Sequence, residues 1–172
     1  PQGFVGAGVA AGIKKSGNRD FALIVNNGPQ RFGTAVFTSN RIEAAPVTWS
    51  KQVVKEGLVS AVVLNSGVAN ACTGPKGFAD THMTAELVGD KLNISSGEVV
   101  VCSTGLIGEL LPMDKIRKGI SQIKLSENGL VDAAKAITNK PLNVVIGPRR
   151  AGDPDELTAV ADKFKRVAGE WQ

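Results

Sequence analysis

The stretch from Val99 to Lys115, VVVCSTGLIGELLPMDK, constrains the fold of this chain most strongly. Three valines and a cysteine form an apolar run, which predicts a buried strand. The run leads directly into the residues Ser103 to Gly105, where we expect a tight turn that holds two hydroxyls and a glycine together. Pro112 then predicts the start of a helix, because proline fits the first helical turn and Asp114 favours its positive end.

The threonine and glycine of this turn suit an oxyanion site. Gly105 lets a ligand approach the backbone closely, and its amide can point into a cleft. Thr104 adds a second donor on a stiff, β-branched side chain. The alternative is a strand end whose hydroxyls satisfy only the local backbone, and spacing alone favours that interpretation.

A second turn-rich segment, NSGVANACTGP at Asn65 to Pro75, follows the apolar run from Val59 to Leu64. A near-continuous apolar run predicts a strand covered on both faces. Sites in α/β proteins tend to lie just after such strands. Asparagines in a loop also satisfy neighbouring backbone groups, so a binding loop and a purely structural loop both remain open.

Strands and helices alternate along the chain, which predicts an α/β or α+β layered domain. We expect a histidine near the apolar face of one helix, His82, to pack rather than act as a base. Periodicity and turn signals predict an extended segment at Gly3–Ile13, a hairpin of strands Phe21–Val25 and Thr34–Phe37, a short strand at Pro46–Trp49, a short helix over Lys51–Glu56 capped by Ser50 and ended by Gly57, and helices at Gly77–Leu92, Met113–Ile123 and Leu130–Ile137.

Composition excludes several classes of protein. With 172 residues, 42% of them hydrophobic, and mean hydropathy near zero, the chain predicts one globular domain. Its net charge of +4 is spread widely and aromatic residues make up only 5%, so we expect no nucleic-acid partner. No apolar run approaches the about 18 residues that span a bilayer, so we expect no membrane segment. Cys72 and Cys102 are too few for a metal cluster or disulfide framework, which predicts buried thiols and a cytoplasmic setting.

Three separated motifs, in this order, resemble those of the ornithine acetyltransferase family, also called glutamate N-acetyltransferase. They are NSGVANACTG (Asn65–Gly74), GFADTH (Gly77–His82) and CSTGLIGELLPMDK (Cys102–Lys115). The likeness extends from Gly3 to Ile137. It implies an α/β fold that is part of a layered α-β-β-α sandwich, with two sheets between helical layers, in a domain formed by residues 1–141.

The resemblance also implies a reaction, the transfer of acetyl from N-acetylornithine to glutamate in arginine biosynthesis, without metal or cofactor. In that family the nucleophile is a threonine at the new amino terminus of a β chain, and the chains form a heterotetramer. Thr104 and Gly105 would then stabilise the oxyanion. Asn65, Asn70 and Thr138 are the implied substrate contacts, although AITNKP around Thr138 departs from the family's Met-Thr-Thr-Asp. No cleavage site with a threonine nucleophile follows, so we expect an α-chain-like part that needs a β chain.

Residues 142–172 change character and form a separate tail. They resemble the C-terminal region of nucleotide-sugar 4-epimerases. We prefer a simpler interpretation, a strand, a Pro-Gly loop and a solvated helix from Asp155 to Ala168. Two further hypotheses therefore stand beside acetyl transfer. One is a non-catalytic or incomplete binding domain, and the other is a sugar-nucleotide-binding module based on the tail.

Overall fold

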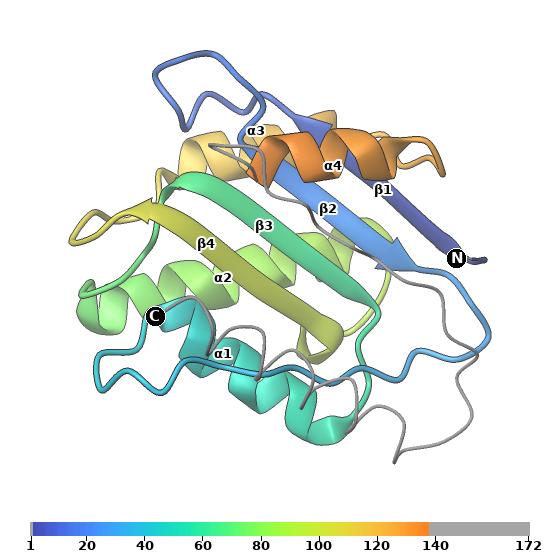
Figure 1. The fold of residues 1–172 in the computed structure, drawn as a ribbon, viewed down its shortest axis with the longest axis horizontal. Helices are drawn as coiled ribbons and strands as arrows, with labels where there is room; N and C mark the ends of the chain where they lie inside the picture. The colour runs from blue at the N-terminus through green and yellow to red at the C-terminus, as the bar shows by residue number, and fades with distance from the viewer. Residues whose placement is uncertain (1, 138–172) are drawn as a thin grey trace, which may run out of the picture.

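Four strands form a single mixed sheet in the order β1-β2-β3-β4 (Figure 1). The computed structural model describes residues 2–137. β1 pairs antiparallel with β2, and β2 pairs antiparallel with β3, whereas β3 and β4 run parallel. The strands are β1 Phe4–Val9, β2 Phe21–Asn26, β3 Ala61–Val68 and β4 Val99–Leu106.

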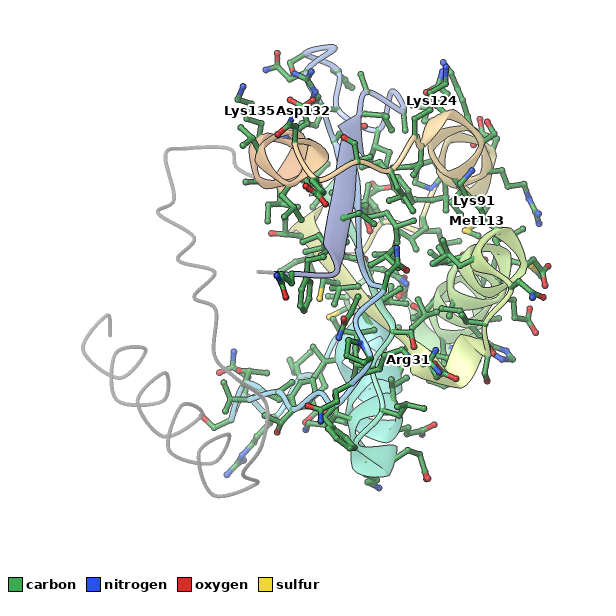
Figure 2. The ribbon with its side chains drawn as sticks, turned by 90° about the vertical axis from the view of Figure 1, so that its right-hand side faces the viewer. Arg31, Lys91, Met113, Lys124, Asp132 and Lys135 are labelled. Carbon is green, nitrogen blue, oxygen red and sulfur yellow. The ribbon has the colours of Figure 1, made fainter. Side chains whose placement is uncertain are left out.

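Helices cover both faces of this sheet. α2 (Gly74–Leu92) connects the parallel strands β3 and β4 and packs on one face together with α3 (Met113–Gln122). α4 (Gly129–Ile137) lies on the opposite face, over β1 and β2, as Figure 2 shows from the side. The main core lies between the sheet and α2 and α3, and its largest fully buried apolar side chains are Phe21, Leu23, Val63, Val88, Val99 and Ile116.

α4 packs very closely on β1. A Cβ at Gly8 would lie 2.0 Å from the Asp132 carbonyl oxygen, and one at Gly129 would lie 1.9 Å from the Gly6 carbonyl oxygen. The small residues of the first segment therefore serve backbone-to-backbone packing, as the sequence predicted for an extended segment.

α1 (Ala45–Val53) covers the outer edge of β4 instead of a face. The Ser50 hydroxyl donates to the Val101 carbonyl oxygen (2.8 Å) and accepts from the Val101 amide (3.1 Å). The indole of Trp49 donates to the Val99 carbonyl oxygen at 3.0 Å. These bonds satisfy edge groups that would otherwise be open to pairing with another strand.

The structure confirms the α/β class and the helices predicted near α2, α3 and α4. Residues 2–137 contain one sheet, and the second sheet of the expected sandwich stays a prediction. His82 packs its ring 4.9 Å from that of Trp49. Gly57 ends a short 3-10 helix, Val54–Glu56, in the left-handed region. The division at residue 141 and the tail after it lie outside the described residues.

Three local predictions were wrong. Residues 34–37 form no strand, because both edges of β2 are occupied by β1 and β3. Residues 46–49 are the first half of α1, where Pro46 begins the helix, and Ser50 lies inside that helix rather than capping another. The expected turn at residues 103–105 is also absent, because pairing with β3 extends β4 to Leu106.

The prediction of buried thiols was wrong as well. Cys72 and Cys102 are both exposed. Cys72 lies in the loop after β3 with a positive φ of 59°. Cys102 alternates with the buried Val101 and so faces the side of the sheet where α4 covers β1 and β2 rather than β4 (Figure 1).

Candidate active site at the ends of β3 and β4

The two turn-rich motifs meet in space. Because β3 and β4 are parallel, their carboxyl ends lie at the same edge of the sheet. The register pairs Asn65 with Ser103, Ser66 with Thr104, and Gly67 with Gly105. Segments 38 residues apart in sequence therefore lie side by side, as the oxyanion hypothesis requires.

The paired glycines allow an unusually close approach of the two strands. Gly105 has a φ of +136°, and a Cβ there would lie 2.2 Å from the carbonyl carbon of Gly67. Gly67 has a φ of +120°, and its Cβ would lie 2.9 Å from a side-chain methyl of Ile13. Only glycine tolerates this backbone conformation and this contact, so both positions depend on the absence of a side chain.

Two exposed residues, Thr104 and Gly105, follow the part of β4 that is bonded to α1 at Val99 and Val101. The backbone groups of Val101 face Ser50 at the outer edge, and such groups alternate between the two edges of a strand. The amide of Gly105, four residues on, therefore points to the same outer edge and away from β3. Thr104 and Gly105 are both exposed residues, and their role as donors to a ligand stays a prediction.

Asn65 and Ser103 form a bond between the strands. The Ser103 hydroxyl donates to Asn65 Oδ1 at 2.5 Å, and Asn65 Nδ2 donates to the Val68 carbonyl oxygen at 2.9 Å. Asn65 is only 4% exposed. Its side chain holds the two strand ends in register, and substrate contact by Asn65 stays a prediction.

Asn70 is completely buried beneath the same edge. Its Nδ2 donates to the Gly77 carbonyl oxygen and to the Thr81 hydroxyl, each at 2.8 Å, and its Oδ1 accepts from the Thr73 hydroxyl at 2.7 Å. Both amide hydrogens are therefore used within the protein. Substrate contact by Asn70 also stays a prediction.

The carboxyl end of α4 reaches the same edge of the sheet, at the left of Figure 1. The Ala136 carbonyl oxygen accepts from the Ser66 hydroxyl at 2.6 Å and from Lys14 Nζ at 3.4 Å. Ser66 is the register partner of Thr104, so the chain leaves α4 beside the candidate donors. Thr138 lies outside the described residues. The sequence analysis did not identify Ser66 and Lys14 as residues of this site. Ser66 could have been found only from the parallel register of β3 and β4, which pairs it with Thr104.

Cys102, two residues before Thr104 on the same face of β4, is not poised as a nucleophile. Although the residue is exposed, surrounding protein desolvates its thiolate and raises the pKa of the thiol from 9.0 to about 11. The thiol is therefore protonated at neutral pH. Residues 2–137 contain no cluster of three or more metal-binding side chains, and no helix among them combines the length and apolar character that crossing a bilayer requires.

The fold and this edge define an α/β domain in which the carboxyl ends of two parallel strands meet, with Thr104 and Gly105 exposed at the end of β4. The chain belongs to the ArgJ family, whose model matches residues 5–140. It is 63% identical over 138 residues to the arginine biosynthesis bifunctional protein ArgJ of Streptomyces avermitilis, which covers 79% of this chain and 36% of that relative. The ArgJ of Mycobacterium tuberculosis H37Rv is 56% identical over 128 residues, 72% of this chain and 32% of the relative.

Two solved structures share the fold. The ornithine acetyltransferase of Mycobacterium tuberculosis, crystallised with ornithine, matches with a TM-score of 0.80 and 51% identity, over 83% of this chain and 79% of that chain. The ArgJ of Bacillus halodurans matches with a TM-score of 0.76 and 36% identity, over 82% of this chain and 75% of that chain. The chain spans about a third of the length of the curated relatives, 36% of the Streptomyces avermitilis protein.

Proposed function

We propose that this chain is the α-chain-like part of an acetyltransferase that moves acetyl from N-acetylornithine to glutamate in arginine biosynthesis. Its contribution is the oxyanion site. The observation that carries this proposal is the close pairing of β3 with β4 at Gly67 and Gly105, where Thr104 and Gly105 are both exposed at the end of β4. Membership of the ArgJ family, and the ornithine bound to a relative with the same fold, support the substrate class.

The chemistry needs a nucleophile from another chain. A threonine hydroxyl there would attack the acetyl carbonyl carbon and pass its proton to its own amine, and the carbonyl electrons would move onto oxygen. The Gly105 amide and the Thr104 hydroxyl would donate to that oxyanion. Collapse would expel the ornithine amine, which takes the proton. The amine of glutamate would then attack the acetyl-threonine carbonyl carbon and lose a proton to the threonine amine, and a second collapse would break the bond to the threonine oxygen, which takes that proton, and release N-acetylglutamate. One such donor is typically worth about 10²–10³ in kcat.

The shares of two mycobacterial relatives that this chain spans support a separate β chain. The chain spans 79% of the solved mycobacterial ornithine acetyltransferase chain but only 32% of the curated mycobacterial ArgJ sequence. This difference is expected if the relative's polypeptide is present as two chains, of which this protein resembles the first. The heterotetramer and the cytoplasmic setting stay predictions.

The proposal is tested by combining this chain with the β chain of a close relative and measuring acetyl transfer from N-acetylornithine to glutamate. Thr104→Val keeps the β-branched shape but removes the hydroxyl, so we expect kcat to fall by about 10²–10³. Thr104→Ser retains the hydroxyl and should retain most activity.

The outcomes separate the parts of the proposal. Equal activity of wild type and Thr104→Val would refute the oxyanion role of the hydroxyl. Absence of transfer in wild type with the β chain would refute the acetyltransferase assignment and favour a non-catalytic domain. Binding of a uridine diphosphate sugar instead would favour the sugar-nucleotide hypothesis, which rests on residues outside the described range.

A further inference from the structure

Asn70 is surrounded by groups that use its side chain fully. It is 0% exposed, and its amide bonds to Gly77 and Thr81 hold it against the first turns of α2. Gly77 has no space for a side chain, because a Cβ there would lie 2.5 Å from Asn70 Oδ1 and 1.9 Å from the hydroxyl oxygen of Thr73. The site is therefore a close-packed polar cluster, and a substrate cannot reach Asn70 without opening it.

The backbone of this loop is held in an unfavourable conformation. Asn70 and Cys72 have positive φ values of 50° and 59°. Such conformations cost about 1 kcal/mol or more each in non-glycine residues and persist only where the surroundings enforce them. The side-chain bonds of Asn70 supply that enforcement, together with the bond from the Ala45 amide at the start of α1 to the Asn70 carbonyl oxygen (3.2 Å).

The same loop is bonded to the chain that follows the Gly105 amide. The Ala69 amide donates to the Leu106 carbonyl oxygen at 2.9 Å, and the Gly108 amide donates to the Ala71 carbonyl oxygen at 2.8 Å. These bonds lie one residue before and one residue after Asn70. Both sequence neighbours of Asn70 are therefore hydrogen-bonded to the chain that follows Gly105, at Leu106 and Gly108.

We propose that Asn70 is a positioning residue, which sets the loop after β4 and thereby aims the oxyanion donors. It acts through Ala69 and Ala71 rather than through contact with substrate. The catalytic consequence rests on the proposed function, whereas the structural coupling does not.

Hydrogen exchange on the isolated chain tests the coupling directly. Asn70→Gly accepts the positive φ but removes all three side-chain bonds, so we expect exchange at the Gly108 amide to increase roughly tenfold, the equivalent of about one net hydrogen bond. Thr84→Val is the matched control. It removes a buried hydroxyl that bonds only within α2, to the Asp80 carbonyl oxygen at 2.8 Å, and should leave the Gly108 amide unchanged.

A milder variant covers the case in which Asn70→Gly does not fold. Thr73→Val removes only the bond to Asn70 Oδ1 and should increase exchange at Gly108 by a smaller factor, about threefold. Unchanged exchange at Gly108 in a folded Asn70→Gly, or in Thr73→Val if only that variant folds, would overturn the coupling.

Kinetics with a β chain then distinguish positioning from contact. A positioning role lowers kcat in Asn70→Gly and leaves KM for N-acetylornithine unchanged, because the donors matter only in the transition state. A raised KM with unchanged kcat would mean that Asn70 binds substrate, and would overturn the positioning role. If wild type transfers no acetyl, the proposed function fails while the exchange result still decides the coupling.

Discussion

Gly105→Ala provides the sharpest test of the strand-end geometry. The added Cβ would lie 2.2, 2.4 and 2.5 Å from the carbonyl carbon of Gly67, its oxygen, and the amide nitrogen of Val68. All three are backbone atoms of the last two residue pairs of the β3–β4 ladder, so no flexible side chain can move aside. The two strands would have to separate where β3 and β4 pair.

Two terms contribute to the cost. A φ of +136° is strained for alanine by about 1–3 kcal/mol, and overpacking against fixed atoms adds about 1–3 kcal/mol. We therefore expect Gly105→Ala to lower the free energy of unfolding by about 2–6 kcal/mol. That is a large share of the roughly 5–15 kcal/mol by which most domains are stable.

Gly108→Ala measures the cost of a positive φ in alanine without the overpacking. Gly108 also has a positive φ, +83°, but nothing lies within 4 Å of its Cβ position. It should cost only about 1–2 kcal/mol. Urea unfolding of wild type and both variants measures the difference. If Gly105→Ala is no more destabilising than Gly108→Ala, the close approach of the two strands is not real and the site loses its geometric basis.

Two further predictions concern buried charge and the thiols. Asp20 is fully buried and accepts from the amides of Ala11 (2.7 Å) and Lys14 (2.8 Å), so Asp20→Asn should cost about 2–3 kcal/mol in urea unfolding, because it replaces a charge-assisted acceptor with a donor. A loss below about 0.5 kcal/mol would contradict that role. Iodoacetamide should label Cys72 faster than Cys102 at pH 8, as followed by mass spectrometry, because the raised pKa of about 11 keeps the Cys102 thiol protonated. Labelling of Cys102 should accelerate as the pH rises from 9.0 toward about 11, and a rate equal to that of Cys72 at pH 8 would exclude the raised pKa.

The local sequence pattern predicted the right type of element where the apolar residues of a single segment followed a clear helical or strand periodicity. The amphipathic stretch that became α3 was predicted close to its observed bounds. The apolar runs of β3 and β4 were correctly predicted to be strands, although the strands extend beyond those runs to Val68 and Leu106. The local pattern gave the wrong element at Pro46–Trp49, because a proline and a short apolar run are equally typical of a strand and of a first helical turn. The position of α1 beside β4 decided between them, and that contact joins residues 51 positions apart.

At the candidate site, too, the sequence predicted some features, and others depended on tertiary packing. Sequence indicated Thr104 and Gly105 as donors and the Asn65 segment as their neighbour, through motif resemblance and the rule that sites follow buried strands. It could not indicate that Asn70 is fully buried. The burial of Asn70 depends on how α2 and the loop after β3 pack together, and the spacing of residues in the sequence does not indicate that packing.

The sequence by itself determined the α/β class, the family and the residue types at the ends of two strands, because these follow from periodicity and from motifs within single segments. Only the tertiary structure decided the register of β3 with β4. Glycine pairs with glycine there, α1 bonds β4 at Val99 and Val101, and the end of α4 meets Ser66. These contacts join segments that are far apart in the chain. They arise when whole helices and strands pack together, and no short stretch of sequence encodes that packing.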